Sequence, residues 1–293
     1  MHADPVEQLR IKADVLQQTL RRIGGIEAEV SVRSLGRQVG WRTRVTLHVD
    51  DEGRAGFFAH GSHEVVAVQR CLQAAPELAL DEVLGQPWPG VDSVYVSGSA
   101  AGRSLIAGAR RFGPDEHYDD VLGRRFHRAV DGFWQSHIDA AEVLAGAVRQ
   151  LVEPVSSVVD LYAGVGLFGL TVLDVLPGAS VTLVEGDRTA AQFARRNAAG
   201  QARVLAIDVR RWRPEPVDLV LLDPPRAGAG AKVVAAIAEA SPATVIYVSC
   251  DPATLARDLK LFAGRGYRID HMEGFDIFPA TAHVETVVRL RRG

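Results

Sequence analysis

The chain is 293 residues long, with 47% hydrophobic residues, 24% charged residues and a formal net charge of −3. These values predict a folded protein with a substantial core, and they exclude a chain that is basic along its whole length. No apolar run reaches the roughly 18 to 20 residues of a membrane-spanning helix, and the first residues lack the basic and then apolar order of a signal peptide. Cys71 and Cys250 are the only cysteines, so the chain by itself cannot form a four-cysteine zinc or iron–sulfur site. We therefore expect a cytoplasmic protein with reduced thiols, no metal and no membrane partner.

The first half of the sequence predicts a small α+β domain, to which we assign residues 1–130. An amphipathic helix is expected from Pro5 to about Ile23. Short β-rich runs, separated by Gly, Asp and Pro, follow the helix and predict an antiparallel sheet. The strands expected in this sheet are Ile26–Val32, Arg42–Val49, Ser93–Val96 and Ser104–Ala107.

Residues 131–293 predict a second domain, in which a helix from about Ser136 to Leu151 precedes an alternation of short apolar runs and helical segments. This alternation is typical of a parallel sheet wound by helices. The expected strands are Ser157–Leu161, Val181–Glu185, Arg203–Ile207, Val217–Asp223 and Thr244–Ser249, and the expected helices are Leu167–Leu176, Thr189–Ala198, Lys232–Ala240 and Thr254–Ala263. Tyr267–Phe275 and Val284–Leu290 then follow without a long helix between them, which predicts an antiparallel pair at one edge. The whole pattern resembles the Rossmann-like α/β fold of class I S-adenosylmethionine (AdoMet) methyltransferases.

A glycine-rich turn, Asp160-Leu161-Tyr162-Ala163-Gly164-Val165-Gly166, lies between the first expected strand and the helix after it. In a wound sheet, ligands bind beyond the carboxyl ends of the strands, where glycine allows the backbone to approach them. Glu185 ends the second strand, where a carboxylate can accept hydrogen bonds from both ribose hydroxyls, and Asp208 follows the third strand at the adenine end. The turn lacks the second half of a dinucleotide fingerprint, which favours AdoMet over NAD. The alternative is a tight structural turn beside surface acids.

Cys250 closes the fifth strand, after the Asp223-Pro224-Pro225-Arg226 turn has closed the fourth, and Glu285 opens the last strand. The C5 atom of uracil is a poor nucleophile, but addition of a thiolate at C6 turns C5 into an enolate carbon that can take a methyl group. A base must then remove the C5 proton before the thiolate can leave. Cys250 and Glu285 are the candidates for these two roles. Their alternatives are a buried core cysteine and a surface carboxylate on an edge strand.

These motifs resemble those of the RNA uracil-C5 methyltransferases, which make 5-methyluridine in tRNA and 23S rRNA. The residues that carry the resemblance are Asp160–Phe168, Leu222–Gly228, Tyr247–Leu259 and Asp276–Glu285, with a looser match at Gly56–Val66 and Phe133–Gln135. The cysteine and glutamate motifs are specific to this family, whereas the glycine turn is shared by many methyltransferases.

The resemblance implies a role for each matching residue. Cys250 is implied as the C6 nucleophile and Glu285 as the base that takes the C5 proton. The residues implied to hold AdoMet are Gln135, Tyr162, Gly164, Glu185, Asp208 and Asp223, and those implied near the target nucleotide are Phe133 and Arg226. The target uridine is expected to be flipped out of its RNA stack into the pocket. Residues 1–130 are then the RNA-facing domain, and residues 131–293 the AdoMet-dependent catalytic domain.

The chain also departs from some relatives, which carry an N-terminal oligonucleotide-binding barrel and a four-cysteine iron–sulfur cluster. The alternatives for this chain are a naturally minimal protein and a truncated form. We expect AdoMet-dependent methylation of uridine C5 in RNA, with 23S rRNA favoured over tRNA as the partner. The alternatives are an RNA-binding protein of the same fold without turnover and an RNA cytosine-C5 methyltransferase. Enzymes of the latter kind carry a Pro-Cys pair at the position where this chain has Pro224-Pro225.

Overall fold

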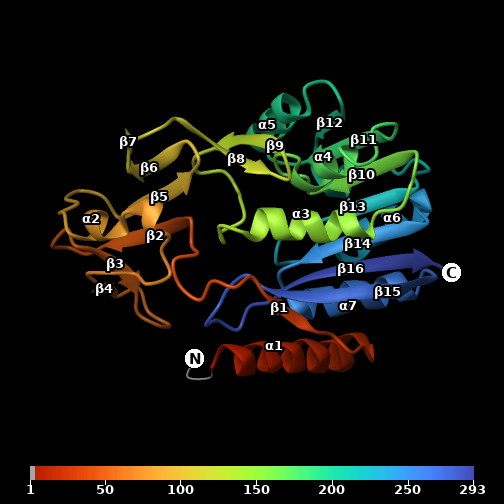
Figure 1. The fold of residues 1–293 in the computed structure, drawn as a ribbon, viewed down its shortest axis with the longest axis horizontal. Coiled ribbons are helices and arrows are strands. Elements are labelled where there is room, and N and C mark those ends of the chain that lie inside the picture. The colour runs from red at the N-terminus through yellow and green to blue at the C-terminus, as the bar shows by residue number, and fades with distance from the viewer. Residues whose placement is uncertain (1–3) are drawn as a thin grey trace. The chain divides into compact units, whose positions relative to one another are not determined.

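A mixed eight-stranded sheet forms the larger of two units in the computed structural model of the protein, which describes residues 4–293 (Figure 1). Its strand order is β1-β15-β16-β14-β13-β10-β11-β12. Strands β10 to β14 run parallel, β16 runs antiparallel to both of its neighbours, and β1 runs parallel to β15. The strands are β1 (Val32–Ser34), β10 (Ser157–Leu161), β11 (Ser180–Glu185), β12 (Arg203–Ala206), β13 (Leu219–Leu222), β14 (Thr244–Ser249), β15 (Tyr267–Asp276) and β16 (Glu285–Arg292). This architecture confirms the expected wound α/β sheet with an antiparallel pair, although β1 and not β15 forms that edge of the sheet.

The central strands of this sheet are covered by helices on both faces. Every residue of β13 is buried, as is typical of a parallel strand inside an α/β sheet. Side chains of α1, α6 and α7 form one hydrophobic cluster with alternate strand residues such as Val159, Val220 and Val245, whereas α3 crosses in front of the strands in Figure 1. Helix α3 (Ala140–Leu151) precedes β10, and the helices that follow the parallel strands are α4 (Leu167–Leu173), α5 (Arg188–Ala198), the short 3₁₀ helix η3 (Val209–Arg211), α6 (Gly230–Ala240) and α7 (Pro252–Ala263). Among residues 4–293, no helix is both long and apolar enough to cross a membrane.

The N-terminal helix α1 (Pro5–Thr19) also packs on this large sheet. Asp4 caps it by accepting a hydrogen bond from the Glu7 amide, and the helix continues into a π-helical turn, η1 (Leu20–Gly24). Leu16 and Leu20 are fully buried in the hydrophobic cluster with α7. Figure 1 shows α1 beside β1 and α7, and α1 contacts both elements.

The strand after α1 differs from the expectation in length and in partner. Residues 26–31 are irregular, and only Val32–Ser34 forms a strand, β1, which pairs with Gly274–Asp276 of β15. The chain up to Gly36 therefore groups with residues 121–126 and 141–293 in one unit. The sequence did not assign the N-terminal helix to this sheet, because an amphipathic pattern shows that a helix is covered but not which sheet covers it.

The smaller unit comprises residues 37–120 and 127–140, and its main feature is an antiparallel sheet of order β4-β3-β2-β5-β6-β7. These strands are β2 (Arg44–Val49), β3 (Ala55–Phe58), β4 (Val65–Ala67), β5 (Ser93–Ser99), β6 (Gly102–Ala107) and β7 (Arg110–Phe112). Their buried side chains form a second core together with the short helices η2 (Pro76–Leu78) and α2 (Leu80–Leu84). A separate ribbon of β8 (Glu116–Val121) and β9 (Arg124–Ala129) follows. The expected antiparallel sheet is thus present as a separate core.

The register of the large sheet brings several strand ends to one edge. Leu161 at the end of β10 pairs with Val184 on one side and with Leu222 on the other. Leu222 in turn pairs with Tyr247 of β14. The residues that follow these strands therefore lie in a row, in which the sequence motifs of the first, second, fourth and fifth parallel strands become neighbours.

Candidate active site

The glycine turn after β10 is joined to the end of β11 by a backbone-to-carboxylate hydrogen bond. The Gly164 amide donates to Glu185 Oε2 at 2.7 Å, and the Asp187 amide donates to Glu185 Oε1 at 2.7 Å. These bonds fix the orientation of the Glu185 carboxylate and leave lone pairs on each oxygen for further donors. A Cβ atom on Gly164 would meet nothing within 4 Å, so the space in front of the turn is open. A fixed acceptor beside an open glycine turn fits the ribose of AdoMet.

Helix α4 approaches the sheet closely because two glycines lie at its start. Gly166 has a φ of 98°, a left-handed conformation that favours glycine. A Cβ atom on Gly169 would lie 2.4 Å from Leu183 Cδ2 and 2.9 Å from Asp160 Oδ2. The absence of that atom allows the Gly169 amide to donate to Asp160 Oδ2 at 2.8 Å.

Asp160 is fully buried under the turn, and sequence reasoning did not single it out as a titrating group. Its Oδ1 atom has no hydrogen-bond partner within the described part of the chain. Burial raises its pKa to about 8, the Gly169 amide opposes this shift, and the charges of Asp223 and Glu185 add to it. An aspartate at the end of an apolar strand was the only signal in the sequence. The structure therefore places a carboxyl that favours its neutral form beneath the cofactor turn.

We predict that Asp160 makes the protein less stable as the pH rises. The folded-state pKa lies above the ordinary value, so the contribution of the neutral carboxyl is complete below about pH 4 and is lost as the pH rises towards about 8. Between pH 5 and pH 8, wild type should lose about 1 kcal/mol or more of unfolding free energy relative to Asp160→Asn. Urea denaturation of both proteins at the two pH values measures this difference. Equal changes in the two proteins would contradict the prediction.

Tyr162 follows β10 and Asp208 follows β12, so the two residues lie on either side of the end of β11, where Glu185 stands. Tyr162 has a φ of 63° and is half-buried, and burial raises its pKa to about 12 with help from the charge on Asp208. Asp208 caps η3 and forms an ion pair with Arg210 at 2.5 Å. The hydrogen bond from the Arg210 side chain lowers the pKa of Asp208 to about 2. The Asp208 backbone lies beside Gly186, directly after Glu185. The structure thus places both predicted binding residues next to the glycine turn and Glu185.

Cys250 and Glu285 meet across the antiparallel pair of β14 and β16. Ser249 pairs with Thr286, and the next step of this register sets Cys250 opposite Glu285. Glu285 is only 3% exposed, whereas Cys250 and Asp223 are half-buried. The register therefore brings together a thiol and a carboxyl that stand 35 positions apart in the chain.

The three acidic groups influence one another strongly. Burial raises the pKa of Cys250 to about 11, the negative charges of Glu285 and Asp223 add to the effect, and Arg226 opposes it. Burial likewise raises the pKa of Glu285 well above its usual range, with a further contribution from Asp223. The pKa of Asp223 rises to about 7 for the same reason, its burial. A carboxyl with a raised pKa is a stronger base than an exposed glutamate.

The turn that carries Arg226 is held by residues of the Tyr247–Leu259 segment for which the sequence predicted no role. Asp258 Oδ2 accepts hydrogen bonds from the Ala229 amide at 2.7 Å and from the Tyr247 hydroxyl at 2.9 Å. Arg257 donates to the Ala227 carbonyl at 2.7 Å. These contacts fix the turn, while the Arg226 side chain remains exposed.

We predict that the thiol of Cys250 reacts slowly at neutral pH in the free protein. In a Cys71→Ser background, alkylation by iodoacetamide should accelerate up to about pH 11, because the raised pKa keeps the thiol protonated. Glu285→Gln removes a neighbouring negative charge and should shift this profile to lower pH. Intact mass measurements of alkylation rates between pH 6 and pH 11 test both statements. A wild-type profile that levels off near pH 8.5, as for an ordinary thiol, would refute them.

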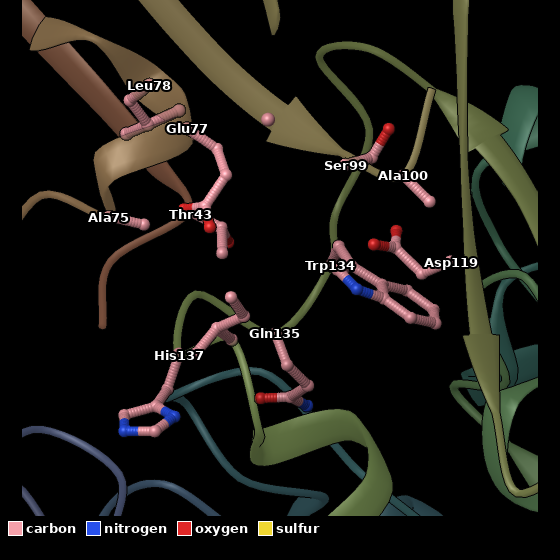
Figure 2. Close-up of a pocket in the computed structure, with 12 residues that line it drawn as sticks. Thr43, Ala75, Glu77, Leu78, Ser99, Ala100, Asp119, Trp134, Gln135 and His137 are labelled. Carbon is pink, nitrogen blue, oxygen red and sulfur yellow. The ribbon is translucent and has the colours of Figure 1, made fainter. Parts of the chain in front are cut away.

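Phe133 and Gln135 lie in the smaller unit, on the segment before α3. Phe133 is 63% exposed, and the guanidinium of Arg44 lies over its ring at 5.5 Å. Arg44 also donates to the carbonyls of Gly132 and Trp134 at 3.1 Å each, which fixes this segment on β2. Gln135 lines a cavity of about 240 Å³ in this unit together with Trp134 (Figure 2).

The large sheet therefore gathers Tyr162, Gly164, Glu185, Asp208, Asp223, Arg226, Cys250 and Glu285 along one edge. A wound sheet with an open glycine turn after its first parallel strand and a fixed carboxylate after the second defines a class I AdoMet methyltransferase.

Comparisons with known proteins identify the family within this class. The family model described as tRNA (Uracil-5-)-methyltransferase matches residues 180–293. A Streptomyces coelicolor protein named as an uncharacterized RNA methyltransferase is 36% identical over 99% of this chain and 74% of its own length. The 23S rRNA (uracil(1939)-C(5))-methyltransferase of Dichelobacter nodosus is 31% identical over 99% of this chain and 80% of its own length. The chain belongs to the RNA uracil-C5 methyltransferase family and is an AdoMet-dependent RNA (uracil-C5)-methyltransferase.

A solved structure shares the same fold. The tRNA (uracil-54, C5)-methyltransferase of Pyrococcus abyssi, in complex with S-adenosyl-L-homocysteine, superposes with a TM-score of 0.79 at 23% identity. The match covers 99% of this chain and 84% of that protein.

Proposed function

We propose that this enzyme methylates uridine C5 through a covalent Cys250–C6 adduct, with 23S rRNA favoured over tRNA as its substrate. The observation that carries the mechanism is the β14–β16 register, in which Ser249 lies opposite Thr286 and the next residues are Cys250 and Glu285, at the edge of the sheet that also carries the glycine turn. The rRNA preference is supported by the Dichelobacter nodosus relative, whose name assigns it to 23S rRNA.

In this mechanism the sulfur of Cys250 forms a bond to C6, and the electron pair of the C5–C6 double bond moves onto C5 and the neighbouring carbonyl. When bound, AdoMet supplies the methyl group that C5 takes up. Glu285 then removes the C5 proton, the double bond re-forms, and the carbon–sulfur bond breaks to return the Cys250 thiolate. Each step uses a residue at the same edge of the sheet.

The electrostatics of the site suit these two roles. Arg226 opposes the raised pKa of Cys250 and so favours the thiolate that attacks C6. Burial makes the Glu285 carboxylate more basic, which favours removal of a proton from carbon. The negative charge of Asp223 also raises the pKa of Glu285, so removal of that charge would make Glu285 a weaker base.

Tyr162, Gly164, Glu185 and Asp223 are the residues we assign to AdoMet, with Asp208 at the adenine end and Gln135 as a further contact. We assign Phe133 and Arg226 to the target nucleotide. The exposed ring of Phe133 can stack on an unpaired base, and the Arg226 fork can bind a phosphate or a base edge. The smaller unit then serves as the RNA-facing part of the protein.

We predict that RNA containing 5-fluorouridine traps the enzyme in the presence of AdoMet. Fluorine at C5 cannot leave as a proton, so the methylated protein–RNA adduct should accumulate with wild type and be absent with Cys250→Ala. Denaturing gels and intact mass detect the adduct on 23S rRNA and tRNA fragments in parallel.

The controls separate the alternatives. AdoMet binding by Cys250→Ala shows that the variant is folded. Trapping on tRNA alone would overturn the rRNA preference, and trapping by 5-fluorocytidine alone would identify a cytosine-C5 enzyme. RNA binding without any adduct would leave a binding protein without turnover.

A further inference from the structure

The loop of residues 277–284 joins β15 to β16 and ends directly before Glu285, so its conformation decides where that carboxyl lies. Lys12, on α1, reaches this loop from more than 260 positions earlier in the chain. Its Nζ atom donates to Asp276 Oδ1 at 2.5 Å, to the Phe278 carbonyl at 3.0 Å and to the His283 carbonyl at 2.7 Å. One side chain therefore contacts both ends of the loop.

These three hydrogen bonds use every proton of the lysine ammonium. Lys12 and Asp276 are also nearly inaccessible to solvent, with side chains 2% and 1% exposed. In such a place neither group can exchange its partner for water, and loss of one leaves the other buried and uncompensated. The loop is thus held by a specific buried contact and not by a mobile surface ion pair.

A second residue of α1 holds the middle of the same loop. Gln8 Oε1 accepts a hydrogen bond from the Ala280 amide at 3.1 Å, and Ala280 has a φ of 60°, which is unusual for a residue with a side chain. Gln8 lies four residues before Lys12. Both belong to one buried stripe of the helix, which continues with Leu16 and Leu20. The sequence pattern calls for apolar residues at these two positions, and polar ones occupy them.

We propose that Lys12 and Gln8 are positioning residues of the active site, through which α1 holds loop 277–284 in the conformation that sets Glu285 opposite Cys250. This inference rests on the proposed function, in which Glu285 removes the C5 proton. Loss of the Lys12 contact should leave Cys250 addition and methylation intact and slow the proton removal that follows. The methylated adduct should therefore accumulate even on ordinary, unfluorinated RNA.

The test compares Lys12→Met with Glu285→Gln and with a matched control on the same helix. Gln17→Ala is that control, because Gln17 donates its hydrogen bond to the Val30 carbonyl, which lies outside the loop. Each protein is mixed with unmodified target RNA and AdoMet for a single turnover, and adduct and released product are quantified on denaturing gels. Lys12→Met should hold about tenfold more adduct than Gln17→Ala, as Glu285→Gln also should. Hydrogen exchange of residues 277–284 should be faster in Lys12→Met alone.

The outcomes distinguish the positioning role of Lys12 from the base role of Glu285. No adduct with Glu285→Gln would refute the base role, and so the proposed function itself. Adduct with Glu285→Gln but control-like behaviour of a folded Lys12→Met would overturn the positioning role alone. If Lys12→Met fails to fold, two other variants replace it. Lys12→Met/Asp276→Leu removes both buried charges, and Gln8→Ala removes the other loop contact without leaving a buried charge unpaired. Adduct levels equal to the Gln17→Ala control in both of these proteins would also overturn the inference.

Discussion

The antiparallel pairing of β16 with β14 is the contact on which the site depends. A purely parallel sheet would continue with a strand whose carboxyl end, not its amino end, faces the cofactor edge. Because β16 runs the other way, its first residue, Glu285, lies beside Cys250, the residue that follows β14. This antiparallel strand thus adds a carboxyl to a row that otherwise consists of turns after parallel strands.

The burial of several carboxyl groups close together is electrostatically unfavourable. Burial raises the pKa of Asp160, Asp223 and Glu285, because it removes the water that would stabilise their charges. Such crowding weakens the folded state at neutral pH. The same crowding makes the carboxylates better bases, and Arg226 is the cation that moderates it near Cys250. Stability and basicity therefore change in opposite directions at this edge of the sheet.

The loops that carry these groups are held from behind by buried charged residues. Asp258 of α7 fixes the turn of Arg226 through backbone amides and the Tyr247 hydroxyl. Lys12 of α1 fixes the loop before Glu285 through two carbonyls and Asp276. In both cases a charged side chain replaces the backbone hydrogen bonds that an irregular loop lacks.

The sequence by itself was enough to predict the wound sheet, the strands along the chain and the turns that follow them, because these depend on local periodicity and on glycine. It also pointed to Cys250 and Glu285, through motifs specific to a family. Which sheet the N-terminal helix packs against was decided only by the tertiary structure, since an amphipathic stripe fits any apolar surface. So were the neutral state of Asp160 and the contact of Lys12 with the loop. Both depend on burial and on partners distant in the chain, which no local pattern records.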